Sequence, residues 1–82
     1  MTELDMVIQR MEDLKDANGI PSNVKDMLEE SIEALEDEDA ELSVRVNSAT
    51  SLLDEISNDP NIAQHTRTEV WNIASMLESV EE

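Results

Sequence analysis

Four segments of this chain carry apolar residues at intervals of three and four positions, and this periodicity restricts the fold more than any other feature. Such spacing gathers the apolar side chains on one face of an α-helix, because the helix repeats every ~3.6 residues. No segment alternates between polar and apolar residues, so we expect an all-α protein without a β-sheet. The four predicted stripes are Leu4, Val7, Ile8, Met11 and Leu14; Val24, Met27, Leu28, Ile32 and Leu35; Leu42, Val46, Ala49, Leu53 and Ile56; and Val70, Ile73, Ala74, Leu77 and Val80.

Short polar segments separate the stripes and predict where the helices begin and end. Thr2 is a plausible N-cap for the first helix, and Asn18-Gly19 supplies the left-handed stop that commonly ends one. Pro21 stands where a second helix can begin, because its missing N–H would have no helical partner there.

The third and fourth helices are separated in the same way. Asp39 is predicted to cap the third helix, which should stop before Pro60 because the residue before a proline disfavours helical geometry. The fourth helix is predicted to start at about residue 62 or 63, with Asn61 and Gln64 forming a pair like a capping box.

The chain also aligns with itself at an offset of 42 residues, so each half is predicted to be one helical hairpin. A period of about 40 residues is typical of helical-hairpin repeats. Two hairpins are too few for a solenoid, so we expect them to close into a four-helix up-and-down bundle. The predicted single domain, 1–82, consists of a hairpin at 1–38, an acidic hinge at 36–41 and a hairpin at 39–82. A true duplication and a chance alignment of two amphipathic hairpins both remain open.

The charge of the chain limits its partners. It has 21 acidic and 5 basic residues, a net charge of −16, which opposes direct binding to nucleic acid or to an anionic membrane. A salt-rich host cytosol and a basic partner could each account for this acidity. There is no cysteine, and no apolar run approaches the ~18 residues that span a bilayer. With an acidic start instead of a signal peptide, a cytoplasmic protein is expected.

Side chains with catalytic or metal-binding potential do not form a recognisable motif. Residues 26–41 hold nine acids and no base, but Leu42 and Ser48 stand where a calcium loop needs glycine and glutamate. His65 is the only histidine and has no partner at a spacing that would orient it as a base or a metal ligand. We therefore expect no enzyme activity, no cofactor, no metal site and no small-molecule substrate.

Three side chains outside the stripes suit either packing or recognition. Trp71, the only aromatic residue, lies one position off its stripe, where packing at the core edge is favoured over anchoring a partner. Met6 and Met76 are predicted near the edges of their stripes, where methionine fills uneven gaps. A methionine-rich recognition groove is the alternative for these two residues.

Residues 56–68 form a stretch with little acidity, containing one acid and one base. Arg67 and Trp71 are four positions apart and therefore share a helix face, and both residue types are enriched in binding hot spots. Arg67, Trp71, His65 and Asn58 are the candidate partner-binding residues. The alternative is that the polar side chains of this stretch only cap helices.

The sequence resembles the archaeal uncharacterised protein family 0147 over nearly its whole length, most specifically in its second half. The resemblance rests on residues 53–61 (LDEISNDPN), 65–68 (HTRT) and 71–73 (WNI), with weaker support from 44–46 (VRV) and 20–21 (IP). Ala63 departs from the proline expected in the family. The resemblance implies a small four-helix archaeal protein and implies no activity.

These observations favour a non-catalytic protein-interaction module that binds a protein partner or a second copy of itself. The alternative is an acidic nucleic-acid mimic or chaperone-like protein that masks a basic partner surface through residues 26–41. An enzyme or metal protein ranks last.

Overall fold

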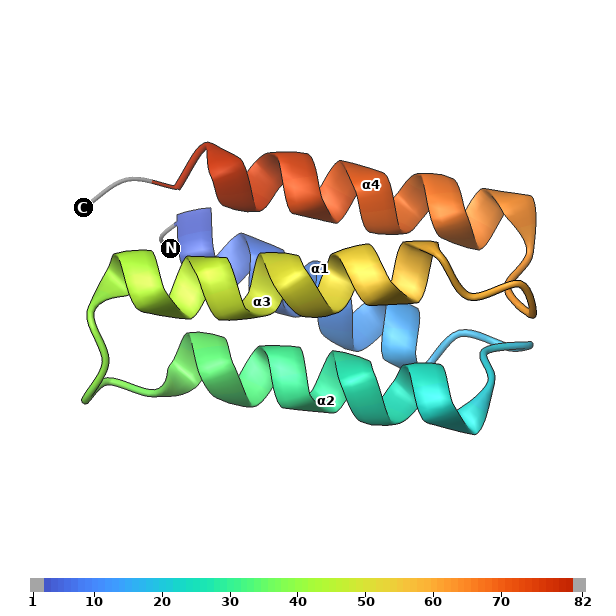
Figure 1. The fold of residues 1–82 in the computed structure, drawn as a ribbon, viewed down its shortest axis with the longest axis horizontal. Helices are drawn as coiled ribbons and strands as arrows, with labels where there is room; N and C mark the ends of the chain where they lie inside the picture. The colour runs from blue at the N-terminus through green and yellow to red at the C-terminus, as the bar shows by residue number, and fades with distance from the viewer. Residues whose placement is uncertain (1–2, 81–82) are drawn as a thin grey trace.

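The computed structural model describes residues 3–80, and these residues form four helices and no strand (Figure 1). The helices are α1 (Glu3–Lys15), α2 (Ser22–Glu36), α3 (Leu42–Ser57) and α4 (Gln64–Glu78). The all-α expectation is confirmed. Thr2, the predicted first cap, lies outside the described residues. No helix within 3–80 is both long and apolar enough to cross a membrane.

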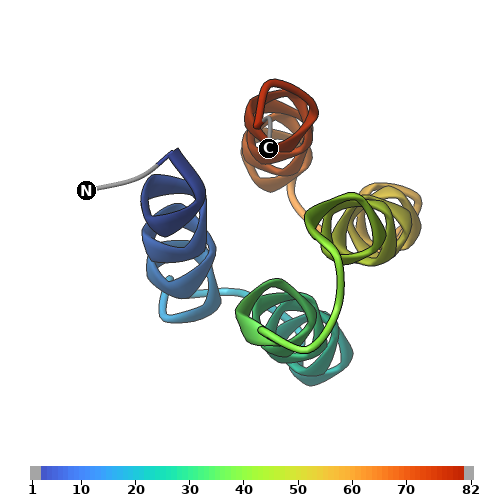
Figure 2. The same cartoon turned by 90° about the vertical axis from the view of Figure 1, so that its left-hand side faces the viewer.

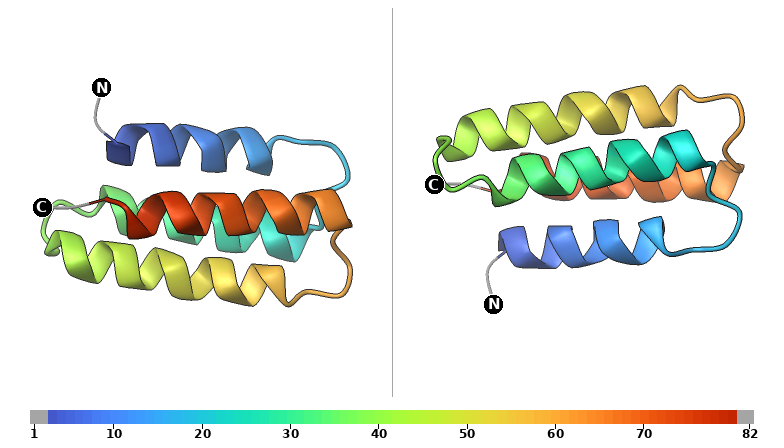
Figure 3. Two further views of the ribbon diagram at one scale, coloured as in Figure 1. Left: turned by 90° about the horizontal axis from the view of Figure 1, so that it is seen from above. Right: turned by 90° about the horizontal axis from the view of Figure 1, so that it is seen from below.

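The helices run alternately up and down around one core. Seen from the end of the bundle they stand at the corners of a square, with α1 next to α2 and α4 (Figure 2). Views from above and below show α4 and α2 each lying between two antiparallel neighbours (Figure 3). The most extensive packing joins α2 to α3, and the least extensive joins α1 to α4. The ring therefore closes most loosely at the α1–α4 side.

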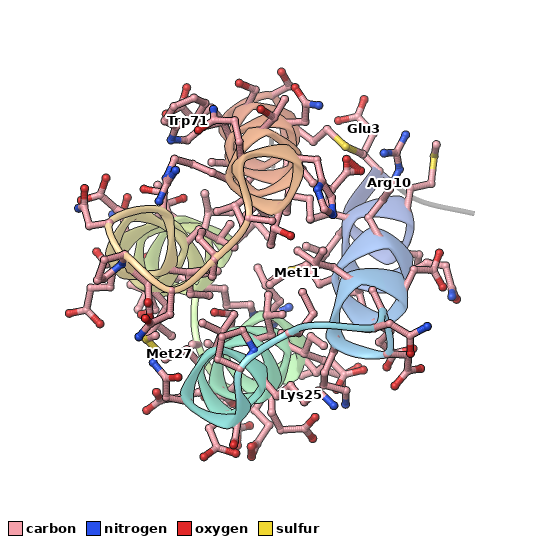
Figure 4. All side chains as sticks on the ribbon, turned by 90° about the vertical axis from the view of Figure 1, so that its right-hand side faces the viewer. Glu3, Arg10, Met11, Lys25, Met27 and Trp71 are labelled. Carbon is pink, nitrogen blue, oxygen red and sulfur yellow. The ribbon has the colours of Figure 1, made fainter. Side chains whose placement is uncertain are left out.

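The predicted stripes form the core. Met11, Leu28, Leu53 and Leu77 are fully buried, and Figure 4 shows Met11 pointing into the middle of the bundle. Ile20 and Ile62, from the two turns at the same end of the bundle, are also buried and close that end of the core. The remaining members of the stripes pack around this centre, with Leu4, Ile8, Met27, Leu42, Val46, Ala74 and Val80 partly buried.

The 42-residue offset recurs in the helix boundaries. Three pairs of equivalent helix boundaries lie 42 positions apart. They are the ends of α1 and α3 (Lys15 and Ser57), the starts of α2 and α4 (Ser22 and Gln64) and the ends of α2 and α4 (Glu36 and Glu78). Burial repeats as well, because aligned apolar residues share a burial class. These pairs are Leu4 and Val46, Val7 and Ala49, Met11 and Leu53, Leu14 and Ile56, Ile20 and Ile62, Leu28 and Val70, and Leu35 and Leu77. The two halves thus share one hairpin design.

One predicted stop is confirmed, and the predicted cap of the third helix is wrong. Gly19 has a φ of 82°, the left-handed conformation expected after α1. Asp39, however, is not the N-cap of α3, because the helix starts at Leu42 and Glu41 precedes it in an extended conformation. The Asp39 N–H instead donates to the Asp37 carboxylate at 3.1 Å, within the loop.

The predicted capping pair of the fourth helix is also wrong. Ala63 is the N-cap of α4 and forms no side-chain cap. The Asn61 backbone N–H donates to Asp59 Oδ1 at 2.7 Å, and Gln64 Oε1 accepts from Arg67 Nη1 at 3.1 Å. Each residue is therefore bonded to a partner other than the one that the spacing suggested.

Candidate functional site

Arg67 is directed into the α3–α4 turn. Its Nε donates to the carbonyl oxygen of Ser57 at 2.8 Å, and its Nη2 donates to that of Asp59 at 3.0 Å. Ser57 is the last residue of α3, where carbonyl groups lack helical partners. The half-buried guanidinium therefore holds the end of α3 in place. Its hydrogen bonds are therefore made within the fold, whereas the sequence placed it on a contact surface together with Trp71.

The other three sequence-predicted site residues are exposed. Asn58 Nδ2 donates to the carbonyl oxygen of Asp54 at 3.1 Å, and His65 lies in the first turn of α4. Trp71 is 52% exposed on the side of α4 away from α1 (Figure 4), and it is not among the side chains packed against the core. The preferred prediction of packing at the core edge is wrong for Trp71. Anchoring a partner remains a prediction.

Asp59 joins the two turns at this end of the bundle. Besides the Asn61 N–H on Oδ1, its Oδ2 accepts from Asn23 Nδ2, near the start of α2, at 2.8 Å. These two hydrogen bonds, first that from Asn61 and then that from Asn23, lower the pKa of the Asp59 carboxyl below its usual value of 3.8. The polar side chains of this end thus bond to one another and stabilise both turns.

A more open surface follows the loosely packed side between α1 and α4. Three shallow hollows of about 190, 290 and 400 Å³ lie in sequence along it. The first two share Met6 and Met76, and the second and third share Arg10 and Asp13. They therefore form one continuous groove, which we call the α1–α4 groove. Its lining residues are Glu3, Met6, Val7, Gln9, Arg10, Asp13, Leu14, Ala17, Glu69, Met76 and Ser79.

Methionines from both helices form the apolar part of the α1–α4 groove. Met6 is 50% exposed, whereas Met76 is partly buried against the core. The unbranched, polarizable methionine side chain adapts to partners of different shape. The sequence placed both residues near the edges of their stripes, but it could not show that they line one groove, because that depends on α1 and α4 being neighbours.

One ion pair crosses the α1–α4 groove. Arg10 Nη1 lies 3.1 Å from Glu69 Oε1, and both side chains remain partly exposed to water. Figure 4 shows Arg10 and Glu3 on the side of α1 that faces α4. Arg10 is the only cation lining this groove among residues 3–80, whereas Glu3, Asp13 and Glu69 line it with carboxylates. The groove is therefore apolar along part of its floor and acidic at its edges.

The acidic stretch at 26–41 forms a second notable surface. All nine of its acids are exposed along α2 and the following loop: Asp26, Glu29, Glu30, Glu33, Glu36, Asp37, Glu38, Asp39 and Glu41. Lys15, at the end of α1, pairs with Glu29, and this hydrogen bond raises the pKa of Lys15 above its usual value of 10.5. Within the described part of the chain, no three acidic or histidine side chains come together in a way that could hold a metal ion.

Comparisons with known proteins agree with the resemblance seen in the sequence. A UPF0147 protein of Methanothermobacter thermautotrophicus is 51% identical over 65 residues, which cover 79% of this chain and 64% of that relative. The chain therefore spans less than two thirds of that protein's length.

Two crystal structures share the fold. The "unknown function protein MMP1188" has a TM-score of 0.91 and 35% identity, and the match covers 98% of this chain and 91% of that one. A protein from the uncharacterised family UPF0147 of Thermoplasma acidophilum has a TM-score of 0.90 and 32% identity, with 96% of this chain and 93% of that one covered. The family described as "Uncharacterised protein family (UPF0147)" matches residues 1–80. The chain therefore belongs to the UPF0147 family.

Proposed function

We propose that this protein is a non-catalytic protein-interaction module and that the α1–α4 groove is its main contact surface. The observation that carries the proposal is the continuity of this groove between two helices, with the half-exposed Met6 at its edge. Thioether, aliphatic and carboxylate side chains suit the recognition of another chain. A flexible methionine surface is a common means of binding helical partners.

Site-specific photo-crosslinking would test this function. A photoreactive amino acid would replace Met6 in the full chain, and a matched control would replace Val44, which is 53% exposed on α3 and does not line the groove. In lysate of the native host, position 6 should crosslink to a defined protein that position 44 does not capture. Excess unlabelled chain should compete for that protein, while excess Met6→Asn chain should not.

Two outcomes would contradict the proposal. Equal crosslinking from positions 6 and 44 would indicate collisions without a specific surface. A crosslinked product that excess unlabelled chain does not compete away would also indicate contact without a specific surface. A surface centred on Trp71 would be tested by the same comparison with the photoreactive group at position 71.

The second candidate function is an acidic mimic or chaperone-like protein that masks a basic surface. It is favoured by the exposure of all nine acids at 26–41, of which only Glu29 forms an ion pair in the described residues, so most of their charges are available for long-range attraction. Such binding should weaken steeply as salt rises, because screening shortens to ~3 Å at molar salt. Neutralising Glu30 and Glu33 together should weaken a partner bound in this way and should leave a partner of the α1–α4 groove bound.

A further inference from the structure

We infer that the α1–α4 groove binds a basic amphipathic helix of a partner protein, which packs as a fifth rod against α1 and α4. This inference rests on the proposed function and adds the chemical class of the partner. It follows from the shape of the groove, from the charge of its edges and from the charge of the whole chain.

The shape of the groove fits a helix. Pairs of lining residues succeed one another along the antiparallel helices, from Glu3 with Ser79, through Met6 with Met76, to Arg10 with Glu69. The hollows therefore follow the length of α1, which has 13 residues and is ~20 Å long. A rod that packs along two antiparallel helices presents apolar residues at intervals of three and four positions.

The apolar residues of the groove determine where apolar side chains of the partner helix would pack. Val7 and Leu14 are 1% and 8% exposed, so they are already buried in the core and form the floor. Met6 is half exposed and can cover an entering side chain. Two apolar anchors one or two turns apart would contact Met6 and Met76 on either side of the groove.

Charge complementarity selects a basic helix. Glu3 and Asp13 line opposite ends of the groove on α1, and no ion pair joins either of them to a cation among residues 3–80. Lysines or arginines flanking the anchors of a partner would lie beside these carboxylates. A second copy of this chain is disfavoured as the occupant, because it would bring another net charge of −16 to an acidic surface.

The Arg10–Glu69 pair competes with such a partner. A cation of the incoming helix can take the place of Arg10 on Glu69, because the two side chains are 52% and 35% exposed. Exposed ion pairs of this kind contribute little to stability, so the exchange is not strongly opposed. Removing Arg10 should therefore strengthen the binding of a basic helix.

The test uses the full chain and synthetic peptides as long as α1, with leucine at intervals of three and four positions. Lysine fills the other positions in the first peptide, glutamine in the second and glutamate in the third, while a fourth has the composition of the first in shuffled order. Affinities are measured by calorimetry at physiological salt. Backbone NMR shifts of the full chain locate the binding site.

The lysine peptide should bind most tightly, with shifts confined to the α1–α4 groove. Met6→Asn should weaken its binding about fivefold to tenfold, as expected for losing part of one buried apolar side chain. Val44→Asn is the matched control, equally exposed and in the first turn of α3, and should have no effect. Arg10→Gln should tighten binding about threefold, and Lys25→Gln, which removes the same charge on α2, should change it less.

Four results would overturn the inference. If the glutamine peptide binds as tightly as the lysine peptide and with the same dependence on Met6, the groove docks helices without regard to charge, and the proposed function stands. If the shuffled peptide binds equally, the attraction is electrostatic only, which favours the acidic mimic. If no peptide binds, the groove does not take helices, and the crosslinking experiment alone decides the proposed function. If sedimentation shows a dimer that Met6→Asn dissociates, the occupant is a second copy.

Discussion

Arg67 shows how a residue that looks like a contact residue in sequence can be committed to the fold. Its guanidinium donates to two backbone carbonyl groups and to Gln64, and so joins the end of α3 to the start of α4. The aligned residue of the first hairpin, Lys25, is exposed and forms no such bonds in the described structure. The two residues occupy equivalent positions but differ in what they stabilise.

The first prediction compares these two residues. Arg67→Gln should lower the free energy of unfolding by about 1 to 3 kcal/mol, because charge-assisted hydrogen bonds to carbonyl groups at the end of α3 are lost. Lys25→Gln should change it by less than about 0.5 kcal/mol. Urea unfolding of both variants measures the difference. An Arg67→Gln protein as stable as the wild type, with a partner lost, would assign Arg67 to the contact surface instead.

The second prediction concerns Asp59 and pH. Hydrogen bonds from Asn61 and Asn23 lower the pKa of Asp59 in the folded state, so folding favours its charged form. The resulting stabilisation is present above the unfolded-state value near 3.8 and is lost as the pH falls through the lower folded-state pKa. Asp59→Asn should therefore melt below the wild type at pH 7, and the two melting curves should converge in acid.

A charge control is needed for Asp59→Asn, because removing any acid relieves repulsion. Asp26→Asn removes the same charge from the exposed face of α2. Its melting temperature should equal or exceed that of the wild type at pH 7. If the melting temperatures of Asp59→Asn and the wild type differ by the same amount at acid and neutral pH, the charge of Asp59 does not contribute to stability.

At the scale of the helices, each element contributes one apolar stripe to the core, and side-chain capping adds nothing at the starts of α2, α3 and α4. No side chain caps the starts of α2, α3 or α4, where Pro21, Glu41 and Ala63 take the N-cap position. Isolated helices of 13 to 16 residues are marginal in water. Burial of the stripes must therefore supply most of the stability of these helices.

The third prediction tests the stripes on α3 and α4. Leu53→Ala and Leu77→Ala should each cost about 2 to 4 kcal/mol, because both side chains are fully buried and leave cavities. Val44→Ala, at a site that is 53% exposed on α3, should cost less than about 0.5 kcal/mol. Chemical denaturation gives all three values. Comparable losses at Val44 and Leu53 would mean that the wrong face of α3 was assigned to the core.

At the scale of the whole molecule, the acids repel one another across a small surface. The bundle measures 34 × 19 × 18 Å and carries a net charge of −16. The ion pairs identified in the described residues, Arg10–Glu69 and Lys15–Glu29, are both partly exposed, so screening them sacrifices little stability. Added salt should therefore act mainly by relieving repulsion.

The fourth prediction follows from this balance. The melting temperature should rise by about 5 °C or more between ~10 mM and ~2 M potassium chloride, since a gain of 1 kcal/mol raises it by roughly 4 to 8 °C in a domain of this size. Thermal melts followed by circular dichroism measure this shift. A melting temperature that stays constant over that range would mean that repulsion does not limit stability.

The sequence alone determined the number of helices, the residues that face the core and the turns at Gly19 and Pro60. Local chemistry controls these features, because the apolar period fixes a helix face and glycine and proline act on their own backbone. The 42-residue offset also predicted the two similar hairpins. The start of α3 was missed because several acids in succession could each serve as its cap, and Glu41, which takes that position, forms no side-chain cap.

Only the tertiary structure decided which polar side chains serve the fold and where a partner could bind. Arg67 and Trp71 share a helix face by spacing, yet the guanidinium is bonded to the end of α3, whereas Trp71 is 52% exposed. Met6 and Met76 lie near the two ends of the chain, and no local rule relates them. They line one groove because α1 and α4 close the ring of helices, and that closure depends on packing between segments distant in sequence.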